Sequence, residues 1–246
     1  MSDKQPVSST IWQWGFTLLF VGVISLGSTA EAAGISLNRT RVVLSGSDKA
    51  ESLGIRNSAA QAWLVQVRIL DAQGNPDYSM VVTPPLFRLE ANGQNYVRLL
   101  PVNGNRGLVS DKETLKYVEV NAVPSSSAAV GNEAQMAVGV GMRIKLFQRP
   151  ASLPEPDKEM FRKIAWSRDI NGLQGCNHSP YYISFRRLEI NGRLMNLNQV
   201  PSMIGPGACE RYPRIKNVNR IRWSAINDYG GDSGWIDEVN PPEPAP

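Results

Sequence analysis

Short segments rich in Val, Ile, Leu and Tyr follow one another closely along this chain, and clusters of turn-forming residues separate them. The segments are Val42–Leu44, Ser52–Arg56, Trp63–Leu70, Val81–Val82, Phe87–Leu89, Tyr96–Leu100 and Leu115–Val123. Turn residues such as Gly, Asn, Asp and Pro gather between them, at residues 45–48, 73–76 and 91–93. Short strands with this punctuation predict a β-sandwich. The sequence contains no convincing amphipathic helix, so we expect an all-β fold.

A proline-bearing stretch, Ala151–Pro156, divides the strand-rich sequence in two. It is typical of a short, semi-rigid hinge between domains. Strand-like segments resume at Ile164–Ser167, Tyr181–Ile190 and Ile215–Ile226. We therefore expect two sandwiches, residues 34–152 and residues 153–239. The proline-rich tail, residues 240–246, is unsuited to a sheet and is expected to be extended and flexible.

The N-terminus has the pattern of an exported protein. An apolar run of 13 residues, Gly15–Gly27, precedes the small-residue site Ala30-Glu31-Ala32. This order predicts a signal peptide, residues 1–33, that is cleaved near Ala32 or Ala33. The alternative is an uncleaved anchor, although a spanning helix needs about 20 apolar residues. No later segment is apolar enough to span a bilayer, so we expect a soluble mature chain.

Length and charge set further bounds on the mature chain. About 213 residues remain after the leader, which fits one large β domain or two of about 100 residues. The formal net charge of the whole chain is +4, and the loss of Lys4, Asp3 and Glu31 makes it one unit more positive. This balance favours solubility and acidic partners. No run of Lys and Arg with interleaved aromatic residues is present, so we expect no nucleic-acid partner.

The segment from Ala134 to Pro150 joins an uncharged apolar strand to a basic end that stops at a proline. Met136, Val138 and Val140 fall on one face of this strand, because side chains alternate with a period of two. At a sheet edge such a strand would offer free N–H and C=O groups to other chains. Either the strand is buried in its own sheet, or it pairs with another protein.

Cys176 and Cys209 are the two cysteines of the chain. In an exported protein an isolated pair predicts a disulfide. On the chain-entropy model it would stabilise the fold by at most about 4 kcal/mol. A metal site is the alternative, but two Cys with the single His178 form a poor ligand set. We expect the disulfide, and no metal or other cofactor.

The sequence does not favour an enzyme. His178 lies in a turn-like Asn-His-Ser-Pro context, and no G-x-S-x-G nucleophile motif is present. The pair Gly230-Gly231 is not a phosphate-binding loop, because no strand-to-helix transition follows it. We expect no catalytic residues, and His178 is interpreted as a solvated or hydrogen-bonded turn residue.

Several blocks of sequence occur in an order that is typical of one family. The blocks are Thr40–Val43, Val81–Leu100, Asp111–Leu115, Ala122–Pro124, Arg143–Pro150, Pro180–Tyr182 and Ile226–Gly231. Together they span essentially the whole mature chain, which resembles a periplasmic pilus-assembly chaperone of the chaperone–usher pathway. The resemblance implies two immunoglobulin-like domains in an L-shaped arrangement. It also implies a periplasmic location, with pilus subunits and an outer-membrane usher as partners.

The resemblance implies a role for the apolar strand. In this family a subunit lacks one strand of its own sandwich, and the chaperone supplies that strand by β-augmentation. Met136, Val138 and Val140 match the family's donor residues. Their burial in a subunit would contribute roughly 5–8 kcal/mol before ordering costs. The alternative is that they form one face of an ordinary core strand.

Two sets of charged residues match functional positions of the family. Arg41 and Lys145 match the pair that anchors the subunit's C-terminal carboxylate, which their donors could satisfy with charge-assisted bonds. The alternative is two solvated strand charges. Glu113, Arg149 and Asp228 match a charge network that fixes the angle between the domains. Three unrelated surface charges are the alternative there.

The chain departs from the family pattern at Val109 and Glu119, where proline and asparagine are usual, and at His178-Ser179, which replaces Pro-Thr. Gly139 and Gly141 make the donor strand more flexible than usual. These departures bear on subunit specificity and binding strength. The short spacing from Pro124 to Arg143 resembles the subclass with a short F–G loop.

The resemblance does not decide whether the free protein caps itself as a dimer. A cis peptide bond at Thr83-Pro84 or Pro84-Pro85 is also left undecided.

The alternative function is a secreted structural or adhesive β-sandwich without a client subunit. Asn38-Arg39-Thr40 and Asn177-His178-Ser179 are formal glycosylation sequons, which would suit such a protein. Tripeptides of this kind also recur by chance, and the first lies inside a block of the family pattern.

Overall fold

The computed structural model describes residues 34–46, 48–105, 111–125, 138–169, 172–215 and 217–239. Over these residues the chain forms strands almost throughout, and its buried apolar side chains gather in two separate cores. No helix in these ranges is long and apolar enough to cross a membrane. The expected signal peptide, residues 1–33, and the expected tail, residues 240–246, lie outside the described residues.

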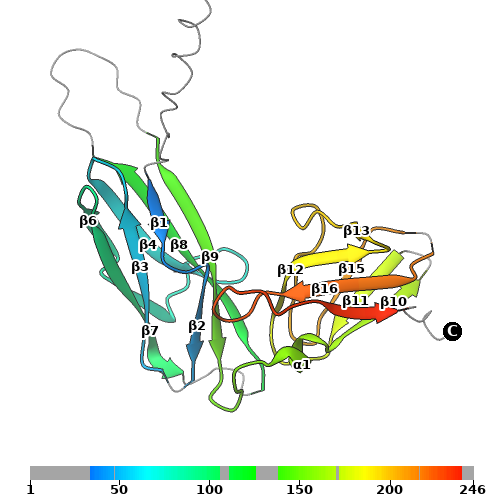
Figure 1. Ribbon diagram of the computed structural model, residues 1–246. Coiled ribbons are helices and arrows are strands. Elements are labelled where there is room, and N and C mark those ends of the chain that lie inside the picture. The colour runs from blue at the N-terminus through cyan, green and yellow to red at the C-terminus, as the bar shows by residue number, and fades with distance from the viewer. Residues whose placement is uncertain are drawn as a thin grey trace, which may run out of the picture. The chain divides into compact units, whose positions relative to one another are not determined.

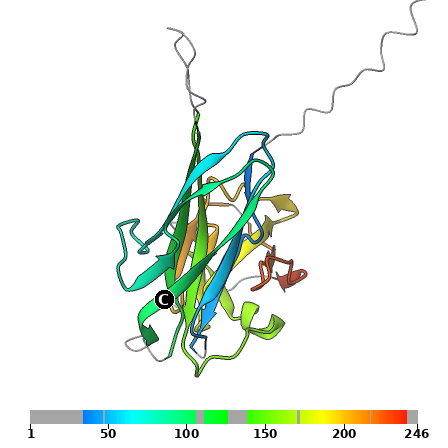
Figure 2. The ribbon, with the colours of Figure 1, turned by 90° about the vertical axis from the view of Figure 1, so that its left-hand side faces the viewer.

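Two sheets form the first sandwich (Figures 1 and 2). One has the order β1–β3–β7–β5, formed by Ile35–Leu37, Glu51–Asn57, Gln94–Asn105 and Met80–Thr83. The other has the order β2–β9–β8–β4–β6, formed by Arg41–Ser45, Val140–Arg149, Thr114–Pro124, Trp63–Leu70 and Leu86–Leu89. Neighbouring strands are antiparallel, apart from β2 and β9, which are parallel.

The first core follows from the alternation of apolar and polar residues along the strands. In β4 the side chains of Trp63, Val65, Val67 and Ile69 are buried, while Gln66 and Arg68 between them are exposed. The same period of two runs through β8, where Val118, Val120 and Ala122 face the core. Alternation of this kind is what a strand with one buried face requires.

The chain crosses from one sheet to the other between β1 and β2. The Asn38 Oδ1 atom lies in this crossing and accepts a hydrogen bond of 2.9 Å from the N–H of Gly54. A Cβ atom at position 54 would lie 3.0 Å from both the Asn38 side chain and the Tyr96 ring. Glycine therefore permits the close approach, and the crossing places Arg41 at the start of β2 beside β9.

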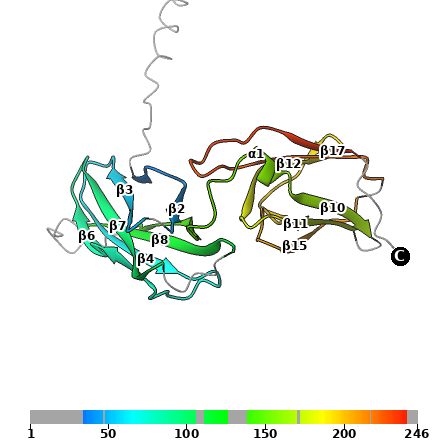
Figure 3. The ribbon, with the colours of Figure 1, turned by 90° about the horizontal axis from the view of Figure 1, so that it is seen from below.

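The second sandwich also has two layers (Figure 3). One sheet has the order β10–β11–β15, formed by Ile164–Asp169, Gly172–Asn177 and Cys209–Tyr212. The other has the order β13–β12–β16–β17, formed by Arg193–Leu194, Ile183–Ile190, Arg220–Ala225 and Ile236–Val239, and β14 (Met203–Ile204) also pairs with β12. The short helix α1 (Lys158–Phe161) precedes β10, and the Asp157 side chain caps its first turn. Trp166 contacts Phe185, Tyr212 and Trp223 in the core between the sheets.

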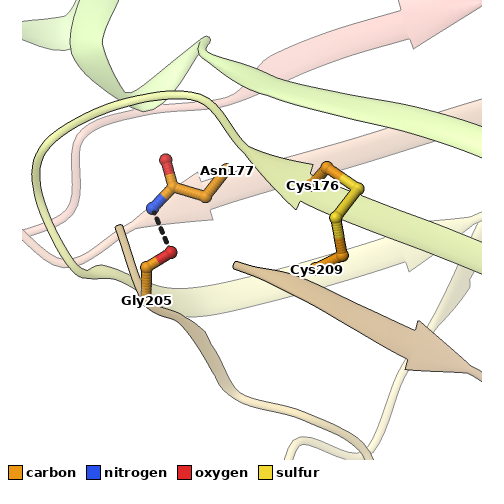
Figure 4. Close-up of a disulfide and its surroundings, with 4 residues drawn as sticks. All are labelled: Cys176, Asn177, Gly205 and Cys209. Carbon is orange, nitrogen blue, oxygen red and sulfur yellow. Dashed lines mark hydrogen bonds between the residues drawn. A yellow bond between two sulfur atoms is a disulfide. The ribbon is translucent and has the colours of Figure 1, made fainter. Parts of the chain in front are cut away.

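A disulfide joins Cys176 of β11 to Cys209 of β15, as the isolated cysteine pair predicts (Figure 4). The two residues lie directly opposite each other in the strand register. Asn177 follows in the same strand, and its side-chain amide donates to the carbonyl of Gly205 at 3.1 Å. The disulfide therefore ties the end of β11 to β15, and the hydrogen bond ties it to the segment just before β15.

The expectation of an all-β chain with two immunoglobulin-like sandwiches is confirmed. Six strands were not expected from the sequence: β1, β11, β13, β14, β15 and β17. The strand expected at Ile215–Ile226 begins only at Arg220. Gly175 explains why β11 was overlooked, because a glycine inside a strand weakens its local signal. In the fold a Cβ at this position would come within 2.9 Å of the Trp166 ring, so the glycine makes room for the core. The peptide bond between Thr83 and Pro84 is cis.

Candidate functional site

Arg41 and Lys145 lie directly opposite each other in the parallel pair of β2 and β9. Arg41 is only 7% exposed, and its Nη1 atom donates to the carbonyl of Ile226 at 3.0 Å. Its Nε atom is buried and has no hydrogen-bond partner among the described residues. The guanidinium lies 5.7 Å from the centroid of the Phe147 ring, which stacks on Tyr182. The cation is thus held in place while part of its donor capacity is unused.

The ammonium group of Lys145 donates to the Ser184 hydroxyl at 2.9 Å. Burial, together with the nearby charge of Arg41, lowers the pKa of Lys145 to about 8. Burial also lowers the pKa of Arg41, against the opposing charges of Asp228 and Glu113. Within the described part of the chain, neither cation forms an ion pair with a carboxylate. Two poorly solvated cations side by side form a site that an anion would stabilise.

Space for such an anion exists beside Arg41. A cavity of about 410 Å³ is lined by Arg39, Arg41, Val43, Glu51, Asp228 and Tyr229. The Arg39 guanidinium is paired with Glu51 at 3.0 Å, and Asp228 is paired with Arg149. Arg41 is therefore the lining cation that lacks a carboxylate partner among the residues described here. A carboxylate in this cavity could accept from Arg41, whereas Lys145 is not among the lining residues.

The N-terminal part of β9 has a free edge. The strand β8 pairs with one side of β9 from Val140 onward, whereas β2 pairs with the other side only from Lys145 to Arg149. Over Val140–Ile144 no described strand covers that second side. Figure 1 shows β9 continuing beyond the start of β2. Free N–H and C=O groups along such an edge can pair with an added strand.

The apolar face of β9 changes from buried to exposed along its length. Leu146 is completely buried, and Ile144, Met142 and Val140 are half-buried against the first core. Val138, just before the strand, is 65% exposed. Met136, the third of the expected donor residues, lies outside the described residues. The apolar face therefore runs beyond the chain's own core at the same place where the edge becomes free.

Arg149 makes ion pairs with both Glu113 and Asp228. Its Nε and Nη2 atoms donate to Glu113 Oε1 at 2.9 and 2.7 Å, and its Nη1 atom donates to Asp228 Oδ2 at 2.8 Å. The second oxygen of Glu113 accepts from the N–H of Tyr182 at 2.9 Å. Burial raises the pKa of Glu113, although the Arg149 charge opposes that shift. The three charges named from the sequence thus meet and connect residues of both sandwiches.

Some partners of these residues carry no strong signal in the sequence. Ser184, the Ile226 carbonyl and the Tyr182 ring all contact the two cations or their immediate neighbours. Tyr182 and Ile226 fall inside blocks that the resemblance rests on, but their contacts depend on the other sandwich. Within the described ranges, no group of three or more His, Cys, Asp or Glu residues is placed to hold a metal.

Comparisons with known proteins agree over nearly the whole described chain. Residues 34–154 match the family model "Pili and flagellar-assembly chaperone, PapD N-terminal domain", and residues 159–234 match "Pili assembly chaperone PapD, C-terminal domain". The chain is 32% identical over 213 residues to the probable fimbrial chaperone LpfB of Escherichia coli O157:H7, which covers 86% of this chain and 90% of the relative. It is 31% identical over 214 residues to the chaperone protein FimC of Escherichia coli strain K12, with 87% and 86% covered.

A similar solved structure is the Salmonella enterica SafA pilin in complex with the SafB chaperone. The match has a TM-score of 0.76 and 24% sequence identity, and it covers 85% of this chain and 97% of the other. At this identity the likeness supports the fold, and the relatives above carry the comparison of function.

Proposed function

Because the chain belongs to the PapD-like family of pilus-assembly chaperones, we propose that it caps pilus subunits through the free edge and apolar face of β9. The family function, a chaperone for the assembly of pilus subunits, is the premise of this proposal. The relatives are chaperones rather than enzymes, and they do not favour a sandwich without a client.

The observation that carries the proposal is the pair of buried cations at the end of the free edge. Arg41 and Lys145 lack a carboxylate partner in the described chain, and they lie where β2 starts to cover β9. The C-terminus of a subunit would supply that carboxylate and could accept from both side chains. The subunit's last strand would then run along Val140–Ile144, beside which no described strand of this chain lies on the second side.

Anchoring the carboxylate would also set the register of the added strand. Lys145 lies five residues after Val140 and seven after Val138, which is about 16 and about 23 Å along a strand. A slip of one residue would turn each apolar side chain to the opposite face. Val138, Val140 and, by sequence, Met136 would thus meet the same places on each subunit. The exposure of Val138 and the half-burial of Val140 support this role.

Co-expression with a cognate pilus subunit tests the anchor. Arg41→Ala and Lys145→Ala should each abolish recovery of the subunit in a one-to-one complex, because each removes a donor to the terminal carboxylate. Arg98→Ala is the matched control, since Arg98 is an exposed arginine of the first sandwich without an ion pair in the described chain. Both anchor variants should still fold. Rescue of the subunit by both variants would show that the carboxylate anchor is wrong.

Glu113, Arg149 and Asp228 are proposed to fix the relative orientation of the two sandwiches. Their contacts support this role, because Arg149 belongs to β9 and Asp228 follows β16. We place the domain boundary near Ser152, with domains at residues 34–152 and 153–239. The gap between the two family matches, and the two separate cores, support a boundary in this region.

Export to the periplasm after cleavage of residues 1–33 is part of the proposal, supported by the leader pattern and by the family. An outer-membrane usher is the proposed second partner. The F–G loop of the family corresponds to the segment between β8, which ends at Pro124, and β9, which begins at Val140. This short spacing supports the subclass with a short F–G loop. Residues 126–137 of the segment lie outside the described ranges.

A further inference from the structure

A groove of about 400 Å³ lies on the second sandwich, and none of its lining residues takes part in the site described above. Its floor is apolar, because Met195, Val200 and Ile215 are half-buried against the second core. Leu194 forms part of its wall and is 61% exposed. Removing such apolar surface from water is favourable. A ligand that covers the groove would therefore gain binding free energy from the burial of this apolar surface.

The groove lies where both sheets of the second sandwich end. β13 contributes Arg193 and Leu194, and β13 is the last described strand of its sheet. On the other side, Pro213 and Arg214 follow β15, the last described strand of the other sheet. The free side of β13 can pair with an added strand, whereas Pro213 has no N–H to donate. The backbone thus favours an extended segment along β13.

Two arginines on the rim of the groove indicate which charge the bound segment should carry. Arg193 and Arg214 are exposed, and neither takes part in an ion pair in the described part of the chain. Other arginines of this sandwich are neutralised: Arg187 pairs with Asp232, Arg220 with Asp237, and Arg222 with Glu189 and Asp237. Two unpaired guanidinium groups beside an apolar floor favour carboxylates that flank an apolar side chain.

We propose that this groove binds a short, extended segment of a partner protein in which acidic residues flank an apolar residue. The apolar residue covers Met195, Val200 and Ile215, and the carboxylates meet Arg193 and Arg214. Main-chain hydrogen bonds to β13 fix the direction of the segment. This binding surface is separate from β9, so the proposal does not depend on the capping of subunits.

The test uses the purified protein and the synthetic peptide acetyl-Glu-Val-Glu-Leu-Glu-amide, followed by amide chemical shifts in NMR spectra. We expect shifts at β13 and at residues 213–215, and a lysine-for-glutamate peptide should produce none. The double variant Arg193→Glu/Arg214→Glu should bind the acidic peptide at least about tenfold more weakly, because both ion pairs become repulsive. Both side chains are exposed, so the variant should keep the unfolding midpoint of the parent.

The control is Arg56→Glu/Arg98→Glu, which makes the same change in net charge on exposed arginines of the first sandwich. It should bind the acidic peptide within about twofold of the parent. Equal weakening in both double variants would overturn the proposal, because the effect would then come from net charge. An absence of groove shifts at millimolar peptide would overturn it as well. Binding of phosphatidylglycerol vesicles that depends on Arg193 and Arg214, without peptide binding, would assign the groove to a membrane surface instead.

Discussion

Asn57 and Asn177 perform the same structural task in the two sandwiches. Each is buried at the end of a strand, and each Oδ1 atom accepts from the N–H two residues later, at 2.9 Å. Each Nδ2 atom donates to the carbonyl four residues later and to a carbonyl of a facing loop, Glu90 or Gly205. One amide therefore satisfies several backbone groups that would otherwise be buried without partners. Asn177 is also unsuited to carry a glycan, despite its sequon.

We expect Asn177→Ala and Asn57→Ala each to lower the free energy of unfolding by roughly 3 kcal/mol, because buried carbonyls lose their donor. Urea denaturation followed by fluorescence measures this change. Asn198→Ala is the control, since Asn198 is exposed, and its effect should stay within about 0.5 kcal/mol. Equal effects of the buried and exposed variants would contradict the role given to the two amides.

The lowered pKa of Lys145 predicts a pH dependence of subunit binding. A bound carboxylate favours the charged ammonium, so the pKa of Lys145 rises above its free value of about 8 on binding. As the pH rises above that value, the free chaperone loses a proton that the complex retains. The affinity for a subunit's C-terminal peptide should therefore fall, by at most about tenfold per pH unit.

Calorimetry between about pH 7 and about pH 9.5 checks this dependence. Arg41, whose charge lowers the lysine pKa, and the neutral Ser184 hydroxyl lie beside Lys145, and Tyr117 lies opposite it in β8. Lys145→Met should bind more weakly and without this decline over the same range. An unchanged affinity of the parent protein from neutral to alkaline pH would count against the lysine as a carboxylate ligand.

At the scale of elements, β9 belongs to two environments. Its C-terminal half lies between β2 and β8 with Leu146 buried, whereas its N-terminal half has one neighbouring strand among the residues that the structure describes. The period of two is unchanged along the strand, so the same face that builds the chain's own core continues outward to Val138. The C-terminal half of β9 is thus part of the chain's own sheet on both sides, whereas one edge of its N-terminal half is available to an added strand.

The Val138→Asp variant should fold normally but should no longer bind the pilus subunit. Val138 lies outside the regular strand and is 65% exposed, so the free energy of unfolding should change by less than about 0.5 kcal/mol. A carboxylate forced into an apolar site of a subunit costs several kcal/mol, so co-purification of the subunit should fail. Val81→Asp is the matched control, because Val81 is a 49% exposed valine on the edge strand β5. Loss of the subunit with both variants would point to a general effect of charge.

At the scale of the whole molecule, a few polar contacts join the two sandwiches. The N–H of Glu113 donates to the carbonyl of Pro180, the Glu113 carboxylate accepts from Tyr182, and Arg149 reaches Asp228. Glu113 and Arg149 are almost fully buried, with side-chain exposures of 2% and 5%. A buried pair of this kind is costly to break, because the remaining charge is left in a poorly solvated place.

Arg149→Ala should lower the free energy of unfolding by about 3–5 kcal/mol at neutral pH. Since burial already raises the pKa of Glu113, loss of the arginine favours the protonated acid further. A carboxyl whose pKa is raised by folding stabilises the fold as the pH falls, so the deficit should shrink between neutral and mildly acidic pH. Arg162→Ala is the control, because its pair with Glu159 is exposed and should contribute less than about 1 kcal/mol. A deficit as small as that of the control, or one that grows at acidic pH, would contradict this account.

Much of the fold could be predicted from the sequence because strand patterns are local. Trp63–Leu70 was expected at the bounds that the structure shows, since its alternation and flanking turns are complete within the segment. The strands β11 and β17 were missed, because glycine and charged residues weaken the same local pattern there. The residues of the candidate site were named through the resemblance to a family, and their roles stay predictions.

The amino-acid sequence by itself determined that the chain forms two sandwiches, which strongly patterned segments become strands, and which side chains carry charge, because these depend on neighbours in the chain. Only the tertiary structure decided that Arg149 reaches both Glu113 and Asp228. It also decided that Arg41 faces Lys145 with no carboxylate partner in the described ranges, and that no described strand covers the second side of β9 over Val140–Ile144. The physical reason is that the solvation of a charged side chain and the pairing of a strand edge depend on which other strands pack beside them. Those strands come from distant parts of the chain, so no local pattern predicts them.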